Sequence, residues 1–163
     1  RLEDAGFPCE VVSAGGTGTY DITSLAPRVT EIQAGSYVFM DNFHRSLISD
    51  FGHALTVLGT VVAQHGQTII LDTGIKSIGV DHEPATMVDY PGYQARSFAE
   101  EHALFDVDER CKLALGDTVE LIPGYAPSTV NLYDVYHVVE GGVVVDIWPV
   151  TPRGPGHGGL ASA

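Results

Sequence analysis

After Asp41 the chain is a series of short runs rich in Val, Ile, Leu and Thr, each closed by turn-forming residues, and this pattern constrains it to a strand-rich fold. The clearest signal is Glu140-Gly141-Gly142, which separates Val135 to Val139 from Val143 to Trp148 and is typical of a hairpin turn. The other runs predict strands over residues 54–63, 68–72 and 117–123, with a hairpin-like break at residues 65–67. We therefore expect a mainly β domain, an antiparallel sheet or barrel.

Residues 1–41 have a different pattern. Leu2 to Ala5 is predicted to end a helix, because Gly6 suits the left-handed C-terminal cap. A strand is predicted over Cys9 to Ser13, then a glycine-rich loop, then a second strand over Val29 to Met40. A helix end, a strand and a glycine-rich loop in this order resemble the last part of a (β/α)8 barrel. The sequence thus predicts two parts, residues 1–41 as the C-terminal remnant of an α/β barrel and residues 42–163 as a β domain.

Charge and composition argue against several classes of partner. The formal net charge is −13 and the isoelectric point is about 4.6, so a nucleic acid or an anionic membrane would be repelled. No apolar run approaches the roughly 20 residues needed to cross a bilayer. Cys9 and Cys111 are too few for a disulfide framework and are expected to be reduced thiols in a cytosolic (cytoplasmic) protein, with a single disulfide as the alternative.

The two ends of the chain also carry expectations. Arg1-Leu2-Glu3-Asp4 contains no initiating methionine and is not a signal peptide, so a fragment or a processed chain is expected. Gly154 to Gly159 is expected to form a mobile terminus, because glycine and proline dominate it.

The most distinctive loop in the chain consists of Gly15, Gly16, Thr17, Gly18 and Thr19. Backbone N–H groups beside small side chains can wrap around an anion, and threonine hydroxyl groups add further donors. No Lys-Ser or Lys-Thr follows, as it would in a P-loop, and the spacing does not fit a dinucleotide-binding fingerprint. The residues alone therefore leave two interpretations open, a phosphate cradle and an ordinary tight turn.

Five strings occur in an order and spacing similar to those of one enzyme family: SAGGTGTY from Ser13, TEIQAGSYVFMD from Thr30, LDTGIK with a later aspartate over residues 71–81, EEH at residues 100–102 and PGYAPSTVNLYD from Pro123. With DIWPV at residues 146–150 they cover nearly the whole chain. The chain resembles the D-threonine aldolase, D-serine dehydratase and 3-hydroxyaspartate aldolase/dehydratase family, which are fold type III pyridoxal phosphate enzymes with an alanine-racemase-like fold. The resemblance implies an N-terminal barrel that holds the cofactor and a C-terminal β domain that completes the site.

The resemblance further implies which residues bind pyridoxal phosphate. Gly15 to Thr19 would grip the phosphate group, Gln33 would face the pyridine ring, and Gly35 and Ser36 would offer more phosphate donors. Strand packing is the alternative role for the second set. The predicted cofactor-binding residues are therefore Gly15, Gly16, Thr17, Gly18, Thr19, Gln33, Gly35 and Ser36.

Pyridoxal phosphate chemistry needs a lysine that holds the aldehyde as a Schiff base and moves protons at Cα. This sequence contains two lysines, Lys76 and Lys112, and both are expected to be solvated surface groups. In the family that the chain resembles, the Schiff-base lysine lies near the start of the barrel. We therefore expect the chain to be inactive alone and to depend on a missing N-terminal barrel or a second subunit.

Many members of the family hold a divalent metal through an H-x-D or H-x-C pair just after Pro-Gly at the end of a strand. The matching residues here are Tyr125, a poor ligand at neutral pH, and Pro127, which offers none. A divalent metal is therefore not expected. Asp134 and His137 lie close by in the sequence and leave a rebuilt site as the alternative.

Two residues are candidates for catalysis. Without the ion, another group must assist deprotonation or departure of the substrate's β-hydroxyl group, and we hypothesise that Tyr125 is this general acid/base; a pocket-lining tyrosine is the alternative. His102 matches a histidine of the EEH string and could face the site, the alternative being a structural histidine. Ser97 and Glu100 match the capping box S-x-x-E and predict a helix over Ser97 to Leu104.

The sequence therefore favours the C-terminal part of a pyridoxal phosphate-dependent lyase that acts on D-3-hydroxy amino acids by retro-aldol cleavage or β-elimination. The lost metal pair gives weight to a racemase or epimerase that uses Tyr125. A non-catalytic dimerisation or interaction domain is a further alternative. A homodimer is expected, because enzymes of this type build the site at a subunit interface, and an exposed apolar face is expected where the barrel docks.

Overall fold

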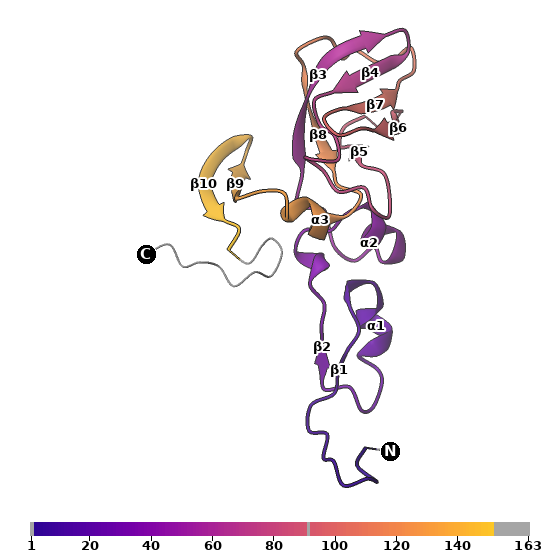
Figure 1. The fold of residues 1–163 in the computed structure, drawn as a ribbon, viewed down its shortest axis with the longest axis vertical. Coiled ribbons are helices and arrows are strands. Elements are labelled where there is room, and N and C mark those ends of the chain that lie inside the picture. The colour runs from indigo at the N-terminus through magenta and orange to yellow at the C-terminus, as the bar shows by residue number, and fades with distance from the viewer. Residues whose placement is uncertain (1, 91, 152–163) are drawn as a thin grey trace.

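The computed structural model describes residues 2–90 and 92–151, and the two ends of this part of the chain differ in architecture. A narrow extension of loops and short helices leads into a curved six-stranded sheet, from whose lower end a separate hairpin projects (Figure 1). The predicted mobile terminus at Gly154 to Gly159 lies outside the described residues. Within them, no helix has the length and the apolar composition that a membrane span requires.

The N-terminal extension contains two short parallel strands. β1 (Ser13–Ala14) pairs with β2 (Glu31–Ile32), and the link between them holds the 3₁₀ helix η1 (Thr17–Thr19) and the helix α1 (Tyr20–Thr23). A second 3₁₀ helix, η2 (Ser36–Val38), follows β2. The parallel pairing agrees with the predicted last strands of an α/β barrel.

The predicted lengths of these elements are wrong. The predicted strands span Cys9 to Ser13 and Val29 to Met40, but only two residues of each strand form pairs. Each strand has a single neighbouring strand, and η2 ends the extended backbone after β2. Leu2 to Ala5 forms a turn with i to i−3 hydrogen bonds and not the end of an α-helix. Gly6 nevertheless has φ +85°, the left-handed conformation predicted for it.

The larger part of the molecule is a six-stranded sheet in the order β5-β8-β3-β4-β7-β6, in which every neighbouring pair is antiparallel. This arrangement confirms the predicted mainly β domain. The strands are β3 (Val57–His65), β4 (Thr68–Leu71), β5 (Thr86–Met87), β6 (Gln94–Phe98), β7 (Ala103–Asp106) and β8 (Thr118–Ile122). The predicted break at residues 65–67 is the β3–β4 turn, where Gly66 has φ +58°.

The core lies on one face of this sheet. Along β3, Val57 and Val61 are buried while Leu58 between them is 69% exposed, the period-2 pattern of a half-buried strand. Strands β4, β7 and β8 contribute to the same cluster the buried residues Ile69, Leu71, Ala103, Phe105, Val119 and Leu121. The ring of Phe105 contacts the ring of Phe98 edge-on, at 5.9 Å between centroids, and so joins β7 to β6.

Replacing Phe105 by alanine is expected to lower the free energy of unfolding by about 3–5 kcal/mol, because a fully buried aromatic ring leaves a cavity between β4 and β6. Urea denaturation followed by circular dichroism measures the change. Leu58→Ala is the matched control, and a loss below about 1 kcal/mol is expected there because the side chain is exposed. Equal losses in the two variants would contradict the assignment of the core.

The helix predicted over Ser97 to Leu104 is wrong. This segment is the end of β6, a turn closed by a hydrogen bond from Ala99 N to His102 O at 2.8 Å, and the start of β7. Pairing with β4 and the contact between Phe98 and Phe105 stabilise the hairpin. The local capping signature is thus outweighed by contacts with distant strands.

Two short helices lie at one end of the sheet, beside the hairpin (Figure 1). The helices are α2 (Asn42–Leu47) and α3 (Ala126–Val130), and the hairpin is formed by β9 (Val135–Glu140) and β10 (Val143–Pro149). Its turn at Gly141 and Gly142, with φ +56° and +80°, confirms the prediction. All seven residues of β10 are exposed, so the hairpin has an apolar surface that the described residues do not cover.

Candidate functional site

The two loops singled out in the sequence lie side by side. Because β1 and β2 are parallel, the loop after β1 and the loop after β2 both begin at the C-terminal end of the strand pair. The hydroxyl oxygen of Thr17 accepts a hydrogen bond of 3.0 Å from the backbone N–H of Tyr37 and joins the loops directly. Thr17 is only 3% exposed, so this link is shielded from water.

Several backbone donors in these loops are free. The backbone N–H groups of Gly15, Thr17, Gly18, Gly35 and Ser36 make no hydrogen bond with a described residue. By contrast, the N–H of Gly16 donates to the Thr19 hydroxyl, and the N–H of Thr19 donates to Gly16 O. A Cβ atom added to Gly16 or Gly35 would meet no atom within 4 Å, so open space adjoins the loops. Free donors facing open space suit an anion such as a phosphate group.

The C-terminal end of α2 fastens these loops to the rest of the molecule. A Cβ atom on Gly18 would lie 2.7 Å from Leu47 Cδ1, so the loop rests directly on this leucine. The Tyr20 hydroxyl donates to Asp50 Oδ2 at 2.7 Å, and the rings of Tyr20 and Tyr37 pack on Phe51 with centroids 5.5 and 5.3 Å away. The loops are therefore held by the segment that starts the β domain.

The N-terminal end of α2 contacts the segment that contains Tyr125. Backbone N–H groups of Asn42 and Phe43 donate to Pro123 O and Gly124 O, at 3.0 and 3.2 Å. Tyr125 follows as the N-cap residue of α3. The helix α2 thus connects the glycine-rich loop at one end with Tyr125 at the other.

Tyr125 is half-buried in a cluster of rings. Its ring meets His82 at 4.5 Å, His44 at 5.8 Å and Phe43 at 6.0 Å between centroids. The sequence predicted no role for His44 or His82, because neither occurs in an H-x-H or H-x-x-x-H pattern. The signal that could have identified His44 is Asp41 three residues earlier, the spacing of an N-cap carboxylate and the N–H group that it caps.

Tyr125 and Pro127, the residues at the predicted metal-ligand positions, offer few ligand atoms. Pro127 lies in the first turn of α3 and has no ligand atom in its side chain. Among residues 2–90 and 92–151, no three histidine, cysteine, aspartate or glutamate side chains are grouped as they would be around an ion. His137, part of the alternative site, lies in β9 opposite Ile147 of the hairpin. The donor set at Tyr125 therefore does not fit a divalent metal.

Neither lysine lies in the loops that could hold a cofactor. Lys76 Nζ pairs with Glu101 Oε1 at 2.5 Å on the surface, and this hydrogen bond raises the pKa of Lys76 above its ordinary value. Lys112 lies in the segment between β7 and β8 and is exposed.

His102, the second catalytic candidate, lies in the exposed turn between β6 and β7. This turn packs on the loop before Ile78 through hydrogen bonds from the N–H groups of Ile75 and Lys76 to Ala99 O and Glu100 O. In the described residues no ring contact joins His102 to the cluster around Tyr125. The structure therefore does not bring the two catalytic candidates together.

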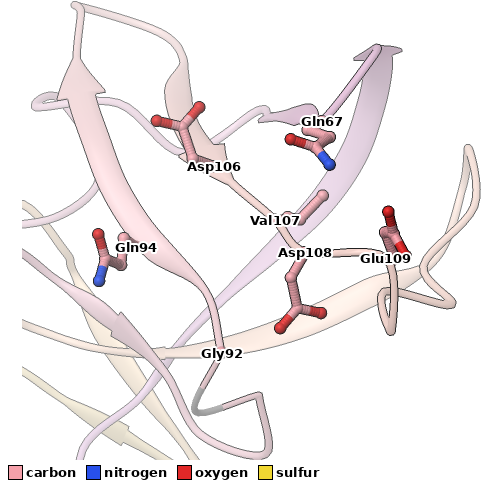
Figure 2. Close-up of a pocket in the computed structure, with 7 residues that line it drawn as sticks. All are labelled: Gln67, Gly92, Gln94, Asp106, Val107, Asp108 and Glu109. Atoms are coloured by element: carbon pink, nitrogen blue, oxygen red, sulfur yellow. The ribbon is translucent and has the colours of Figure 1, made fainter.

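Described residues line two of the hollows on the surface of the β domain. The first, of about 250 Å³, lies near the β3–β4 turn, away from α2 and α3; Figure 2 shows its lining residues Gln67, Gly92, Gln94, Asp106, Val107, Asp108 and Glu109. Asp106 and Asp108 pair there with Arg96 and Arg110, so the acidic groups are partly neutralised. The second, of about 350 Å³, lies beside α3 and is lined by Ile75, Ile78, Gly79, Val80, Asp81, Ser128 and Leu132.

Gly124→Ala is expected to lower the free energy of unfolding by about 3 kcal/mol, because the added Cβ atom would lie 1.6 Å from Glu83 O, a backbone atom. The backbone before Tyr125 would have to move away from this contact. Thermal unfolding of Gly124→Ala and of the control variant Gly52→Ala measures the effect. Gly52 has open space around it, so a fall in stability below about 1 kcal/mol is expected; equal losses would contradict the close packing at Gly124.

Similar proteins match nearly the whole chain. Residues 54–139 match the family model described as "Putative serine dehydratase domain". D-threonine aldolase from Arthrobacter sp is 34% identical in an alignment of 159 residues, which covers 94% of this chain and 42% of that protein.

Two solved structures have the same fold over nearly the whole chain. D-threonine aldolase from Filomicrobium marinum has a TM-score of 0.86 at 29% identity, over 93% of this chain and 44% of that chain. D-threo-3-hydroxyaspartate dehydratase from Delftia sp. HT23 has a TM-score of 0.78 at 27% identity, over 94% of this chain and 47% of that chain. The chain thus spans less than half the length of these similar proteins.

Proposed function

The chain belongs to the serine dehydratase domain family, and from this premise we propose that it forms the C-terminal part of a pyridoxal phosphate-dependent lyase for D-3-hydroxy amino acids. The names of the similar proteins, D-threonine aldolase and D-threo-3-hydroxyaspartate dehydratase, support this substrate class. The first enzyme name describes cleavage and the second elimination, and both reactions act on a β-hydroxyl group.

One observation carries the cofactor part of the proposal, namely the pair of loops joined by the hydrogen bond between Tyr37 N and Thr17 Oγ1. The free N–H groups of these loops would hold the cofactor phosphate, with open space beside Gly16 and Gly35 to receive it. The exposed side chain of Gln33 would face the pyridine ring from the same edge. All eight predicted cofactor-binding residues thus lie in these two loops.

When bound, pyridoxal phosphate supplies an electron sink for the electron pair left on the substrate's Cα atom. The residues of this chain orient the cofactor through its phosphate and move protons at the substrate's β-hydroxyl group. Tyr125 has the position of the usual metal-binding histidine and is the proposed acid/base at that oxygen, because a phenol exchanges protons without an ion. Its hydroxyl group makes no hydrogen bond with a described residue and is not buried, so a substrate can reach it.

The Schiff-base lysine must then come from a second domain, because Lys76 is paired with Glu101 and Lys112 lies far from the loops in sequence. We assign residues 1–41 to the end of an α/β barrel that would contain this lysine and residues 42–163 to the β domain. Exposed apolar side chains of the hairpin, among them Val143, Ile147 and Trp148, support docking of a further domain or subunit. A homodimer is the assembly that we propose.

The complete protein that contains this chain is expected to convert D-threonine or D-3-hydroxyaspartate in the presence of pyridoxal phosphate. Detection of glycine and an aldehyde would identify retro-aldol cleavage, whereas ammonia and a 2-oxo acid would identify β-elimination. L-threonine is the control substrate. Racemisation of D-amino acids without either set of products would contradict the proposed lyase function and favour an epimerase.

A further inference from the structure

We propose that His44, oriented by the buried carboxylate of Asp41, is the general base that removes the proton of the substrate's β-hydroxyl group beside Tyr125. This role rests on the proposed function and deepens it. In retro-aldol cleavage the imidazole would accept the proton of the β-hydroxyl group while the neighbouring phenol donates a hydrogen bond to the same oxygen. In β-elimination the phenol would donate its proton to the departing hydroxyl group.

Asp41 is completely buried, and its carboxylate is fully engaged. Oδ1 accepts hydrogen bonds from the backbone N–H of His44 at 2.7 Å and from His44 Nδ1 at 2.8 Å. Oδ2 accepts one from the backbone N–H of Ala126, the residue after Tyr125, also at 2.7 Å. One carboxylate therefore fixes the imidazole of His44 and the backbone that positions Tyr125.

The bond to Asp41 determines which nitrogen of His44 can act as a base. A carboxylate only accepts hydrogen bonds, so Nδ1 must bear the proton and Nε2 is left with its lone pair. Nε2 makes no hydrogen bond with any described residue and is not a buried atom, so solvent or a ligand can reach it. The same arrangement of carboxylate, imidazole and free nitrogen orients histidine bases in hydrolytic triads.

The ring of His44 lies close to Tyr125. The two rings are nearly parallel, at 15° and with 5.8 Å between centroids, so the two side chains are direct neighbours. Besides Asp41 and Tyr125, the ring contacts only Phe43 among the described aromatic and charged side chains. His82 packs on Tyr125 and Phe43 from another side, and no carboxylate of the described residues holds its ring.

The backbone conformation of Met40, the residue before Asp41, indicates that the fold fixes the position of this carboxylate. Met40 has φ +54° and is the one residue other than glycine with positive φ in the described part of the chain. Such a conformation is unfavourable in a non-glycine residue and persists where the surroundings fix it. Met40 is completely buried, so the fold imposes this turn and thereby directs Asp41 towards His44 and Ala126.

The proposed step is balanced within the substrate and His44. In retro-aldol cleavage the β-O–H bond breaks and its proton binds His44 Nε2, while the electron pair forms the new carbonyl bond. The Cα–Cβ bond breaks, and its electron pair stays at Cα, which takes a proton from solvent to give glycine, while His44 releases its proton to solvent. An imidazole is suited to the first transfer, because its neutral ring has a nitrogen lone pair that accepts a proton.

The arrangement can be tested on this chain without any cofactor. Long-range ¹H–¹⁵N correlation spectra of the imidazole rings report which nitrogen bears the proton, and His44→Phe assigns the signals. The proposal predicts the proton on Nδ1 of His44 in the parent chain and a shift of the tautomer balance towards Nε2 in Asp41→Asn. A proton on Nε2 in the parent chain would overturn the proposal.

The catalytic role is tested in the complete protein with D-threonine and pyridoxal phosphate. His44→Phe retains a ring against Tyr125 and is expected to lower kcat by about 10²- to 10⁴-fold. In the parent protein, activity is expected to fall towards acidic pH, where the base becomes protonated. This fall is expected to be absent from the pH profile of His44→Phe. His82→Phe also retains a ring beside Tyr125 and is expected to keep kcat within about threefold of the parent, because no carboxylate orients His82.

The outcomes separate the two proposals. If the parent protein converts D-threonine and His44→Phe retains its rate and its pH profile, the role of His44 is wrong while the proposed function stands. If the parent protein forms no product from any D-3-hydroxy amino acid, the proposed function is wrong and the role of His44 fails with it. A large loss in His44→Phe with an altered pH profile, beside an active His82→Phe, supports both.

Discussion

Tyr125→Phe in the complete protein is expected to lower kcat at least about a hundredfold, because general acid–base catalysis contributes roughly 10²–10⁴. The substitution removes one hydroxyl group and keeps the ring that packs against Phe43, His44 and His82. The binding of the cofactor should change little, because its proposed phosphate donors are backbone N–H groups in other loops. Steady-state kinetics with D-threonine, together with a cofactor titration, measure the two effects separately.

Tyr133→Phe is the matched control for this variant. Its hydroxyl group donates a hydrogen bond of 2.7 Å to Ser77 O, a structural contact near α3, so the expected loss is about 1 kcal/mol of stability with kcat nearly unchanged. A kcat of Tyr125→Phe within about threefold of the parent value would contradict an acid/base role. Tyr125 would then be a residue that only lines the substrate site.

Asp41→Ala is expected to lower the free energy of unfolding of this chain by about 3 kcal/mol or more. The substitution leaves the N–H groups of His44 and Ala126 without their acceptor, and each buried unsatisfied group costs roughly 1–3 kcal/mol. The imidazole of His44 loses its partner in addition. Urea denaturation monitored by circular dichroism measures the loss, and ring signals in the NMR spectrum report whether His44 and Tyr125 remain in contact.

Asp50→Ala provides the comparison, because its carboxylate accepts a hydrogen bond from the Tyr20 hydroxyl but is exposed to solvent. A loss below about 1 kcal/mol is expected there, since water can replace the bond. Similar losses at the two positions would mean that Asp41 is not the buried anchor of α2 and α3 described above.

The antiparallel part of the fold could be predicted because its signals are local. Gly141 and Gly142 adopt positive φ in the turn of the predicted hairpin, and Gly66 does the same between β3 and β4. The error at Ser97 to Leu104 has the opposite origin. There a local capping signature was outweighed by the burial of Phe105 and by pairing with β4, which depend on residues far away in the sequence.

The candidate site was partly predictable for the same reason. The two loops could be recognised from their own residues, and the hydrogen bond between Thr17 and Tyr37 brings them together. The contact between Asp41 and Ala126 joins residues 85 positions apart, and no pattern in the sequence pointed to it. His44 was therefore overlooked although it lies beside Tyr125, whereas His102 was selected from a matching string and lies in a separate turn.

In the proposed function this chain completes a pyridoxal phosphate site whose lysine lies outside residues 1–163. The most direct test is borohydride reduction of the complete protein after incubation with pyridoxal phosphate, followed by peptide mapping with mass spectrometry. We predict that the pyridoxyl group is found on a lysine of another domain and that neither Lys76 nor Lys112 is labelled. Labelling of Lys76 or Lys112 alone, or no specific labelling, would contradict the claim.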